Sequence, residues 1–154
     1  MDLFYSLWIM MIGSFIIQFF IMSLIMSNTV DNITFSMGKF YLSCIMALLM
    51  GVLEVGMNDY HVIYFSSIYN LSLSYYLSLG FALVVFIYLY RNQMYIDDSE
   101  YLKEMIEHHS MAILTSDSIL EKTQSDRVQK LAENILSTQE AEIKYMKQLV
   151  ETIS

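Results

Sequence analysis

Residues 3–26 read LFYSLWIMMIGSFIIQFFIMSLIM, an apolar run in which Gln18 is the only strongly polar side chain. The run is long enough to form an α-helix across a bilayer, which takes roughly 20 residues for a hydrocarbon core about 30 Å thick. No basic residues precede it and no small-residue cleavage motif follows it, so we interpret it as a membrane helix and not as a secretion signal. The chain is therefore predicted to be an integral membrane protein, with the lipid bilayer as its first partner.

Two more apolar runs follow. Residues 39–57 form a shorter run, and residues 62–90 form a longer run that is rich in tyrosine and serine. The polar residues 58–61 predict a tight turn between these runs, and the polar residues 27–38 predict a loop after the first run. The 154-residue chain has no proline and only 5 glycines, which favours long helices over a turn-rich β fold. We expect residues 1–91 to be a membrane domain with three transmembrane helices.

The charged residues gather in the last third of the chain. The sequence has 16 acidic and 8 basic residues, a net charge of −8, which argues against nucleic acid as a partner because phosphate binding needs a basic face. Asp97 as a cap with Glu100 three residues later predicts a helix start. The apolar periodicity then predicts one helix to about residue 122 and a second to the end of the chain. The expected fold class is therefore all-α, with a two-helix antiparallel hairpin over residues 92–154 after the membrane helices.

Such a hairpin buries too little apolar surface to be stable by itself. Pairing with a second copy would make a homo-oligomer built around a four-helix bundle. Docking on its own membrane helices, or on another subunit of a membrane complex, would also cover the exposed face. The sequence is compatible with each of these arrangements.

Residues 104–111, EMIEHHSM, contain the groups best suited to chemistry. On a helix, Met105 and His109 lie one turn apart, and His108 is a neighbour of both Met105 and Met111. Imidazole nitrogen suits copper and zinc, whereas thioether sulfur selects soft ions such as Cu(I) and Ag(I). The alternation of these two groups predicts a copper site, and a polar layer that binds no metal is the competing interpretation.

The second helix of the hairpin extends this cluster. In an antiparallel pair that turns near residue 124, His109 falls near Gln139 and Glu142, and Met146 lies one turn beyond them. Polar side chains on a core face are costly unless they are paired. We therefore expect these polar residues either to satisfy one another or to hold a metal ion.

The second apolar run carries a further face, on which Met46, Met50, Glu54 and Met57 recur at helical spacing. An ionisable side chain at membrane depth is a functional hypothesis by default. Glu54 lies within one turn of the polar residues 58–59, so we favour a side chain that reaches water over a metal site inside the membrane.

Three blocks, residues 101–113, 127–132 and 139–146, resemble the domain-of-unknown-function 305 (DUF305) family, in the right order and spacing over essentially all of residues 97–152. The resemblance implies a ferritin-like helical bundle and, in characterised members, copper or silver binding through Met and His. Carried over to this chain, the implied metal ligands are Met105, His108, His109, Met111, Glu142 and Met146.

One residue departs from the family pattern, and one further segment extends the likeness. Glu107 stands where family members usually have proline, and glutamate keeps the helix unbroken there. Residues 40–50 resemble, more loosely, a membrane extension that some bacterial members carry.

These features predict a membrane-anchored metal-binding protein that buffers or hands over Cu(I) or Ag(I). We expect no catalytic activity, because no nucleophile–base pair or phosphate-binding loop is recognisable. The alternative is a structural or accessory membrane subunit whose hairpin mediates oligomerisation without a metal. A ferritin-like oxidase is disfavoured because Glu104 and His108 are four residues apart, whereas such sites use Glu-x-x-His.

The orientation in the membrane is predicted differently by two arguments. Lys39 and Arg91 flank the same side of a three-helix arrangement, and the positive-inside rule would place that side, with the C-terminal helices, in the cytoplasm. The family resemblance implies an extracytoplasmic C-terminal domain, and we adopt that expectation.

Overall fold

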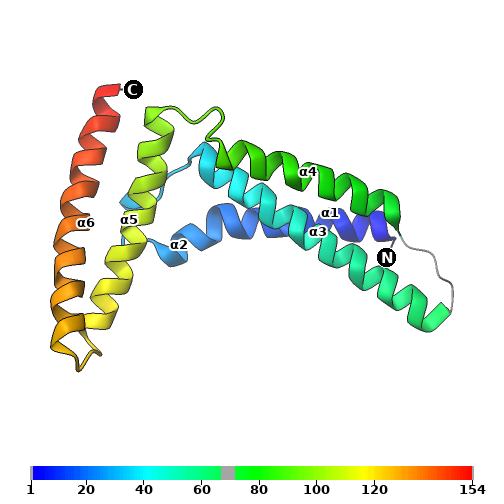
Figure 1. The fold of residues 1–154 in the computed structure, drawn as a ribbon, viewed down its shortest axis with the longest axis horizontal. Helices are drawn as coiled ribbons and strands as arrows, with labels where there is room; N and C mark the ends of the chain where they lie inside the picture. Colours follow the sequence, from blue (N-terminus) through cyan, green and yellow to red (C-terminus); the bar gives the residue numbers. More distant parts are fainter. Residues whose placement is uncertain (1, 67–71, 154) are drawn as a thin grey trace. The chain divides into compact units, whose positions relative to one another are not determined.

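The computed structural model describes residues 2–66 and 72–153 (Figure 1). Within these residues every regular element is a helix and there is no strand, so the predicted all-α class is confirmed. Three helical runs are long and apolar enough to cross a membrane: Leu3–Met26, Met37–Phe65 and Leu73–Arg91. The prediction of three long apolar helices is therefore also confirmed.

The chain divides into two compact units. The first, which we name the apolar unit, contains Met1–Phe20 and Phe40–Met94, and the second, the polar unit, contains Ile21–Lys39 and Tyr95–Ser154. This division differs from a single boundary after residue 91, because the residues between the first two apolar helices pack with the C-terminal helices.

The first apolar run is not a uniform α-helix. It consists of α1 (Leu3–Ile16), a π-helical turn η1 (Ile17–Ile21) and α2 (Met22–Met26). The π-helical turn contains Gln18, the only strongly polar residue of the run. A π-helical turn has one residue more than an α-helical turn.

The second apolar helix is longer than predicted. We expected a turn at residues 58–61, but α3 (Met37–Ser66) continues through them, and that prediction is wrong. Polar residues end a helix only when they carry a breaker or a competing cap, and residues 58–66 contain neither proline nor glycine. The buried Asp59 carboxylate instead accepts hydrogen bonds from the backbone N–H of Ser72 (3.0 Å) and from its hydroxyl (2.7 Å).

As a result, the third apolar helix begins later than predicted. The expected span was 62–90, whereas α4 covers Leu73–Arg91. Residues 67–71 of the expected span lie outside the described residues.

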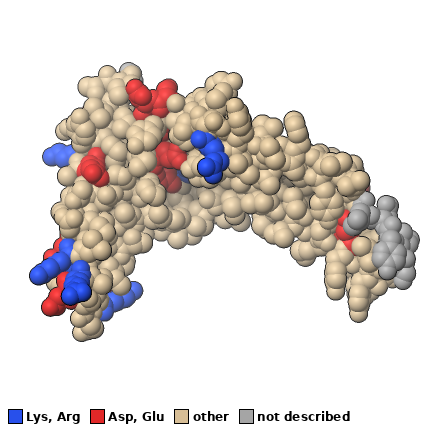
Figure 2. Space-filling view, in the orientation of Figure 1, with Lys and Arg blue, Asp and Glu red and all other residues tan. Residues whose placement is uncertain are grey.

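The core of the apolar unit lies where α1, α3 and α4 meet. Its buried members are Leu7, Leu48, Val55 and Leu79. Gly51 permits the close approach of α1, because a side-chain carbon at that position would lie 3.1–3.2 Å from Met11 and Leu7. Most other large apolar side chains of this unit are exposed, and Figure 2 shows the unit with very few charged side chains on its surface.

The polar unit is built on α5 (Asp98–Leu120) and α6 (Asp126–Ile153), which lie side by side and are joined by residues 121–125 (Figure 1). As predicted, Asp97 caps α5, and its carboxylate accepts the N–H of Glu100 at 2.8 Å. The buried core between the helices consists of Leu102, Ile106, Ile113, Ile143 and Met146. The segment Ile21–Lys39 packs on α5 and includes the short 3₁₀ helix η2 (Val30–Asn32).

Candidate metal site and the polar network beside it

Two of the predicted sulfur ligands lie at the core of the polar unit. Met146 on α6 is buried, and Met105 on α5 packs against the cluster of apolar side chains that contains it. The two helices therefore bring thioether groups from residues 41 positions apart in the chain to the same hydrophobic cluster.

One helical turn away, polar residues meet across the same pair of helices. The Nδ1 atom of His109 lies 3.2 Å from Oε2 of Glu142, and the amide of Gln139 donates to the same oxygen at 3.3 Å. His109 is four residues after Met105, and Glu142 is four residues before Met146. Each helix thus contributes one polar and one thioether side chain at i, i+4 spacing, which places them on one face.

The imidazole of His109 is short of a hydrogen-bond partner. Its Nδ1 atom is buried and makes no hydrogen bond, because the 3.2 Å approach to Glu142 lacks the required alignment. Burial lowers the pKa of His109 below its usual value of 6.5; the Glu142 carboxylate opposes this shift and His108 adds to it. His109 is therefore neutral at neutral pH, which is the form of imidazole that binds metals.

The two remaining predicted ligands are His108 and Met111. His108 is exposed, and the centroid of its ring is 6.3 Å from that of His109. Met111 is half-buried on α5, outside the buried cluster that contains Met146. The structure therefore places Met105 and Met146 at one apolar cluster, and it places His109 and Glu142 against each other.

The donor set decides which metal this group suits. Among residues 2–66 and 72–153, no three His, Cys, Asp or Glu side chains lie together in a way that could hold a metal ion. Met105 and Met146, each four residues away along the same helix, could supply further donors to a metal ion at His109 and Glu142. Sulfur of this kind suits Cu(I) and Ag(I) and is rare in zinc sites.

The predicted methionine face of the second apolar helix does not assemble into a comparable group. Glu54 accepts a hydrogen bond from the hydroxyl of Ser6 on α1. Met46 and Met57 are both exposed. The carboxylate of Glu54 thus has a partner of its own within the apolar unit.

A polar network lies elsewhere on α5, with Glu107 at its centre. One Glu107 oxygen accepts from Nζ of Lys39 at 3.0 Å and from the backbone N–H of Thr34 at 3.2 Å. The other oxygen accepts from the hydroxyl of Ser23. The side chains of Lys39 and Glu107 are only 12% and 20% exposed, so this ion pair is largely shielded from water.

Two further acids of α5 meet the first turn of α3. Glu100 accepts the backbone N–H of Met37 at 2.6 Å, and a side-chain carbon at Gly38 would overlap the carboxylate of Glu104. Together with Glu107 these acids recur at i, i+4 and i+7, on one face of α5. The first N–H groups of a helix have no partners within it and carry partial positive charge, so carboxylates are stabilising there.

A fully buried serine completes the attachment of the loop. The Ser110 hydroxyl donates to Oδ1 of Asn28 at 2.7 Å and accepts the backbone N–H of Asn28 at 2.9 Å. The amide of Asn32 donates to the same Oδ1 at 2.8 Å. Our sequence reasoning missed this network, although the spacing of Glu100, Glu104 and Glu107 on one helical face is a detectable pattern.

A family comparison covers the C-terminal helices. Residues 93–153 match the model of a family described as a domain of unknown function, DUF305. This match agrees with the resemblance carried by the three sequence blocks. Residues 21–39, which supply the partners of Glu107 and Ser110, lie outside it.

A curated relative matches over a similar length. An uncharacterised protein of Acanthamoeba polyphaga mimivirus is 39% identical over 69 residues. The alignment covers 45% of this chain and 45% of the relative, so the chain matches less than half of the length of that protein. No solved structure matches the chain significantly.

Proposed function

We propose that this chain is a membrane-anchored metal-binding protein that holds Cu(I) or Ag(I) in its polar unit and buffers the ion or hands it over. The observation that carries the proposal is the buried Nδ1 atom of His109, which lies beside Glu142 without a hydrogen bond. A buried polar atom without a partner is costly, and a bound ion would remove that cost.

The neighbouring side chains supply suitable donors. His109 would bind the ion through nitrogen, and Met105 and Met146 through sulfur, with Glu142 close enough to balance its charge. Bound there, the metal would serve as cargo, so the site needs affinity and not a catalytic base. His108, exposed beside His109, and the half-buried Met111 suit a second set of donors through which an ion enters or leaves.

Membrane anchoring is supported by the three apolar helices and by their exposed side chains. Trp8 is 50% exposed and Phe81 is 74% exposed. Contiguous exposed apolar surface is unfavourable in water and favourable in lipid. Carbonate extraction tests this part of the proposal, and release of the full-length protein into the soluble fraction would contradict it.

The orientation follows from the family resemblance, which implies an extracytoplasmic polar unit. The positive-inside argument for the cytoplasm depends on two residues, Lys39 and Arg91. We therefore keep the extracytoplasmic placement as part of the proposal.

A second copy of the chain would complete a ferritin-like four-helix bundle. On α6, Val128 and Leu131 are 42% and 59% exposed, which leaves an apolar face uncovered in one chain. An amphipathic helix normally buries such a face. The same observation favours the alternative function, an accessory membrane subunit in which His109, Gln139 and Glu142 form a polar layer without a metal.

Competition for Cu(I) between the full-length protein and a chromophoric chelator distinguishes these two functions. Met105→Leu removes the sulfur at nearly constant volume, and we expect it and His109→Ala each to weaken Cu(I) binding by about 10-fold or more. Met57→Leu, on the exposed side of α3, is the matched control and should change nothing. Zn(II) should compete poorly.

The stability of His109→Ala must be measured beside its affinity, because the variant removes a neighbour of Glu142. If substitution of both histidines leaves the Cu(I) affinity unchanged, the residues form a structural layer and the accessory-subunit function replaces our proposal.

A further inference from the structure

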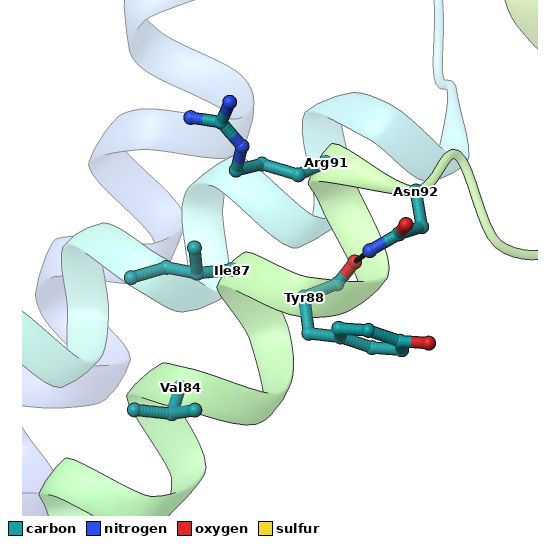
Figure 3. Close-up of a pocket in the computed structure, with 5 residues that line it drawn as sticks. All are labelled: Val84, Ile87, Tyr88, Arg91 and Asn92. Carbon is teal, nitrogen blue, oxygen red and sulfur yellow. Dashed lines mark hydrogen bonds between the residues drawn. The ribbon is translucent and has the colours of Figure 1, made fainter.

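The end of α4 carries an open depression on the surface of the apolar unit. Its volume is about 540 Å³. Its lining passes from apolar to polar along the helix, as Figure 3 shows: Val84, Ile87, Tyr88, Arg91 and Asn92.

The hydrogen bonds that cap the C-terminal end of α4 do not involve the side chain of Arg91. Gln93 has a φ of 51° and ends the helix in the left-handed region, the N–H of Met94 bonds the carbonyl of Leu89 at 3.0 Å, and that of Gln93 bonds Tyr90 at 3.1 Å. These are the two hydrogen bonds of a Schellman motif. The carbonyl groups of Leu89 and Tyr90 are thus satisfied by backbone N–H groups.

Side chains add to this closure. The amide of Asn92 donates to the carbonyl of Tyr88 at 2.8 Å, which Figure 3 shows as a dashed line. The hydroxyl of Tyr41 on α3 donates to the carbonyl of Met94 at 2.9 Å and ties the end of α4 to its neighbour. Arg91 is therefore held on a fixed backbone, but its guanidinium is not used to cap the helix.

The guanidinium of Arg91 makes no hydrogen bond or ion pair with any residue that the structure describes, and its side chain is exposed. Lys39 is the only other basic residue among the first 100, and it is paired with Glu107. The positive charge of Arg91 is thus the one uncompensated cation among the described residues of the apolar helices.

The position of Arg91 along the helix matches a lipid headgroup. The 19 residues of α4 span about 28 Å, close to the thickness of a hydrocarbon core of about 30 Å. Arg91 therefore lies at the level of the headgroups if Leu73 lies at the opposite boundary. In Figure 3, Val84, Ile87 and Arg91 point to the same side of α4.

We propose that this depression binds a phospholipid, with the guanidinium of Arg91 on the phosphate and an acyl chain along Val84 and Ile87. Arginine donates two parallel hydrogen bonds to a phosphate, which gives geometry as well as charge. The exposed phenol of Tyr88 belongs to a residue type that is enriched at the membrane interface. The inference rests on the membrane location proposed above and is independent of metal binding.

The test uses the full-length protein in detergent and native mass spectrometry. Titration with an anionic phospholipid, phosphatidylglycerol, measures the affinity of the tightest-bound lipid. We expect Arg91→Gln to weaken that affinity about 10-fold, which corresponds to the loss of one charge-assisted contact. Arg91→Lys keeps the charge without the planar guanidinium, and its lipid affinity should lie between those of Arg91→Gln and the unmodified protein.

Arg127→Gln, which removes an exposed arginine from α6, is the matched control and should bind the lipid as the unmodified protein does. Circular dichroism checks that each variant keeps its helix content. Equal lipid affinity of folded Arg91→Gln and the unmodified protein overturns the proposal. Equal displacement of the lipid by inorganic phosphate also overturns it, because the site would then recognise the anion without the acyl chain.

Discussion

Nζ of Lys39 lies 3.0 Å from Oε2 of Glu107, a residue 68 positions further along the chain, and both side chains are largely buried. The pair joins the start of α3 to the middle of α5. The Lys39 ammonium also donates to the carbonyl of Thr34 at 2.9 Å and lies over the ring of Phe35. A buried charge with several fixed partners gives large effects when one partner is removed.

Glu107→Gln should loosen the segment 21–39. The substitution keeps the volume but leaves the ammonium of Lys39 without its counter-charge, so we expect the free energy of local opening to fall by about 3 kcal/mol. Hydrogen exchange of residues 28–39 measures this directly. Glu140→Gln, at an exposed position of α6, should leave the exchange unchanged. The double variant Lys39→Gln, Glu107→Gln should recover part of the loss, and a loss equal to the sum of both singles would contradict the pairing.

Ser110→Ala should have a comparable but smaller effect. It leaves the backbone N–H of Asn28 without its hydrogen-bond partner and removes one of the two donors to Oδ1 of Asn28, at a cost of about 2 kcal/mol. Ser118→Ala, the same change on the exposed side of α5, should stay within about 0.5 kcal/mol. Hydrogen exchange of residues 28–32 is again the measurement, and equal behaviour of the two variants would refute the role of Ser110.

The stability of the metal-free polar unit should fall in mild acid because of His109. Its pKa is lowered in the folded state, mainly by burial, so the unfolded chain binds the proton first. The contribution is complete above the unfolded pKa near 6.5 and is lost as the pH falls from there through the folded pKa. His109→Gln should reduce the difference in thermal stability between pH 7.5 and pH 5.5, a window chosen to bracket roughly this range.

His108→Gln is the informative companion to that experiment. His108 helps to lower the pKa of His109, whereas Glu142 raises it. Removing His108 should therefore shrink the pH dependence without abolishing it. An identical pH dependence in the His109→Gln variant and the unmodified protein would assign the effect to other groups.

A dimer is expected for the full-length protein in detergent. The exposed Leu131 of α6 would lie in the interface between copies, so Leu131→Gln should shift the sedimentation of the protein toward the monomer. Glu133→Gln, two residues further along α6 and exposed, is the control. A monomeric unmodified protein at micromolar concentration would remove the bundle from our proposal.

Helical periodicity predicted much of this molecule from its sequence. Hydropathy identified the three apolar helices, because lipid-spanning length is a local property of composition. The same spacing argument placed His109 near Gln139 and Glu142, since the short connection between α5 and α6 leaves few possible registers. Polarity was a poor guide to helix ends, as residues 58–61 show, because no breaker accompanies it.

The contacts of Glu107 could not be predicted in this way. Its partners Ser23, Thr34 and Lys39 lie far from it in the sequence, and no periodic pattern links a loop to a distant helix. Glu107 supplies two oxygen acceptors to a segment that the family match does not include.

The two-part composition of the polar unit has a consequence for biosynthesis. Residues 21–39, which are the end of the first apolar helix and the loop after it, are synthesised early. Tyr95–Ser154 is synthesised only after two more apolar helices. With all three helices inserted, two crossings separate the halves, and both emerge on the same face of the bilayer. A nascent chain that omits one crossing strands the halves on opposite faces, and Lys39 cannot reach Glu107. In a membrane, we therefore expect the Lys39–Glu107 ion pair to form only in a chain whose second and third apolar helices have both inserted.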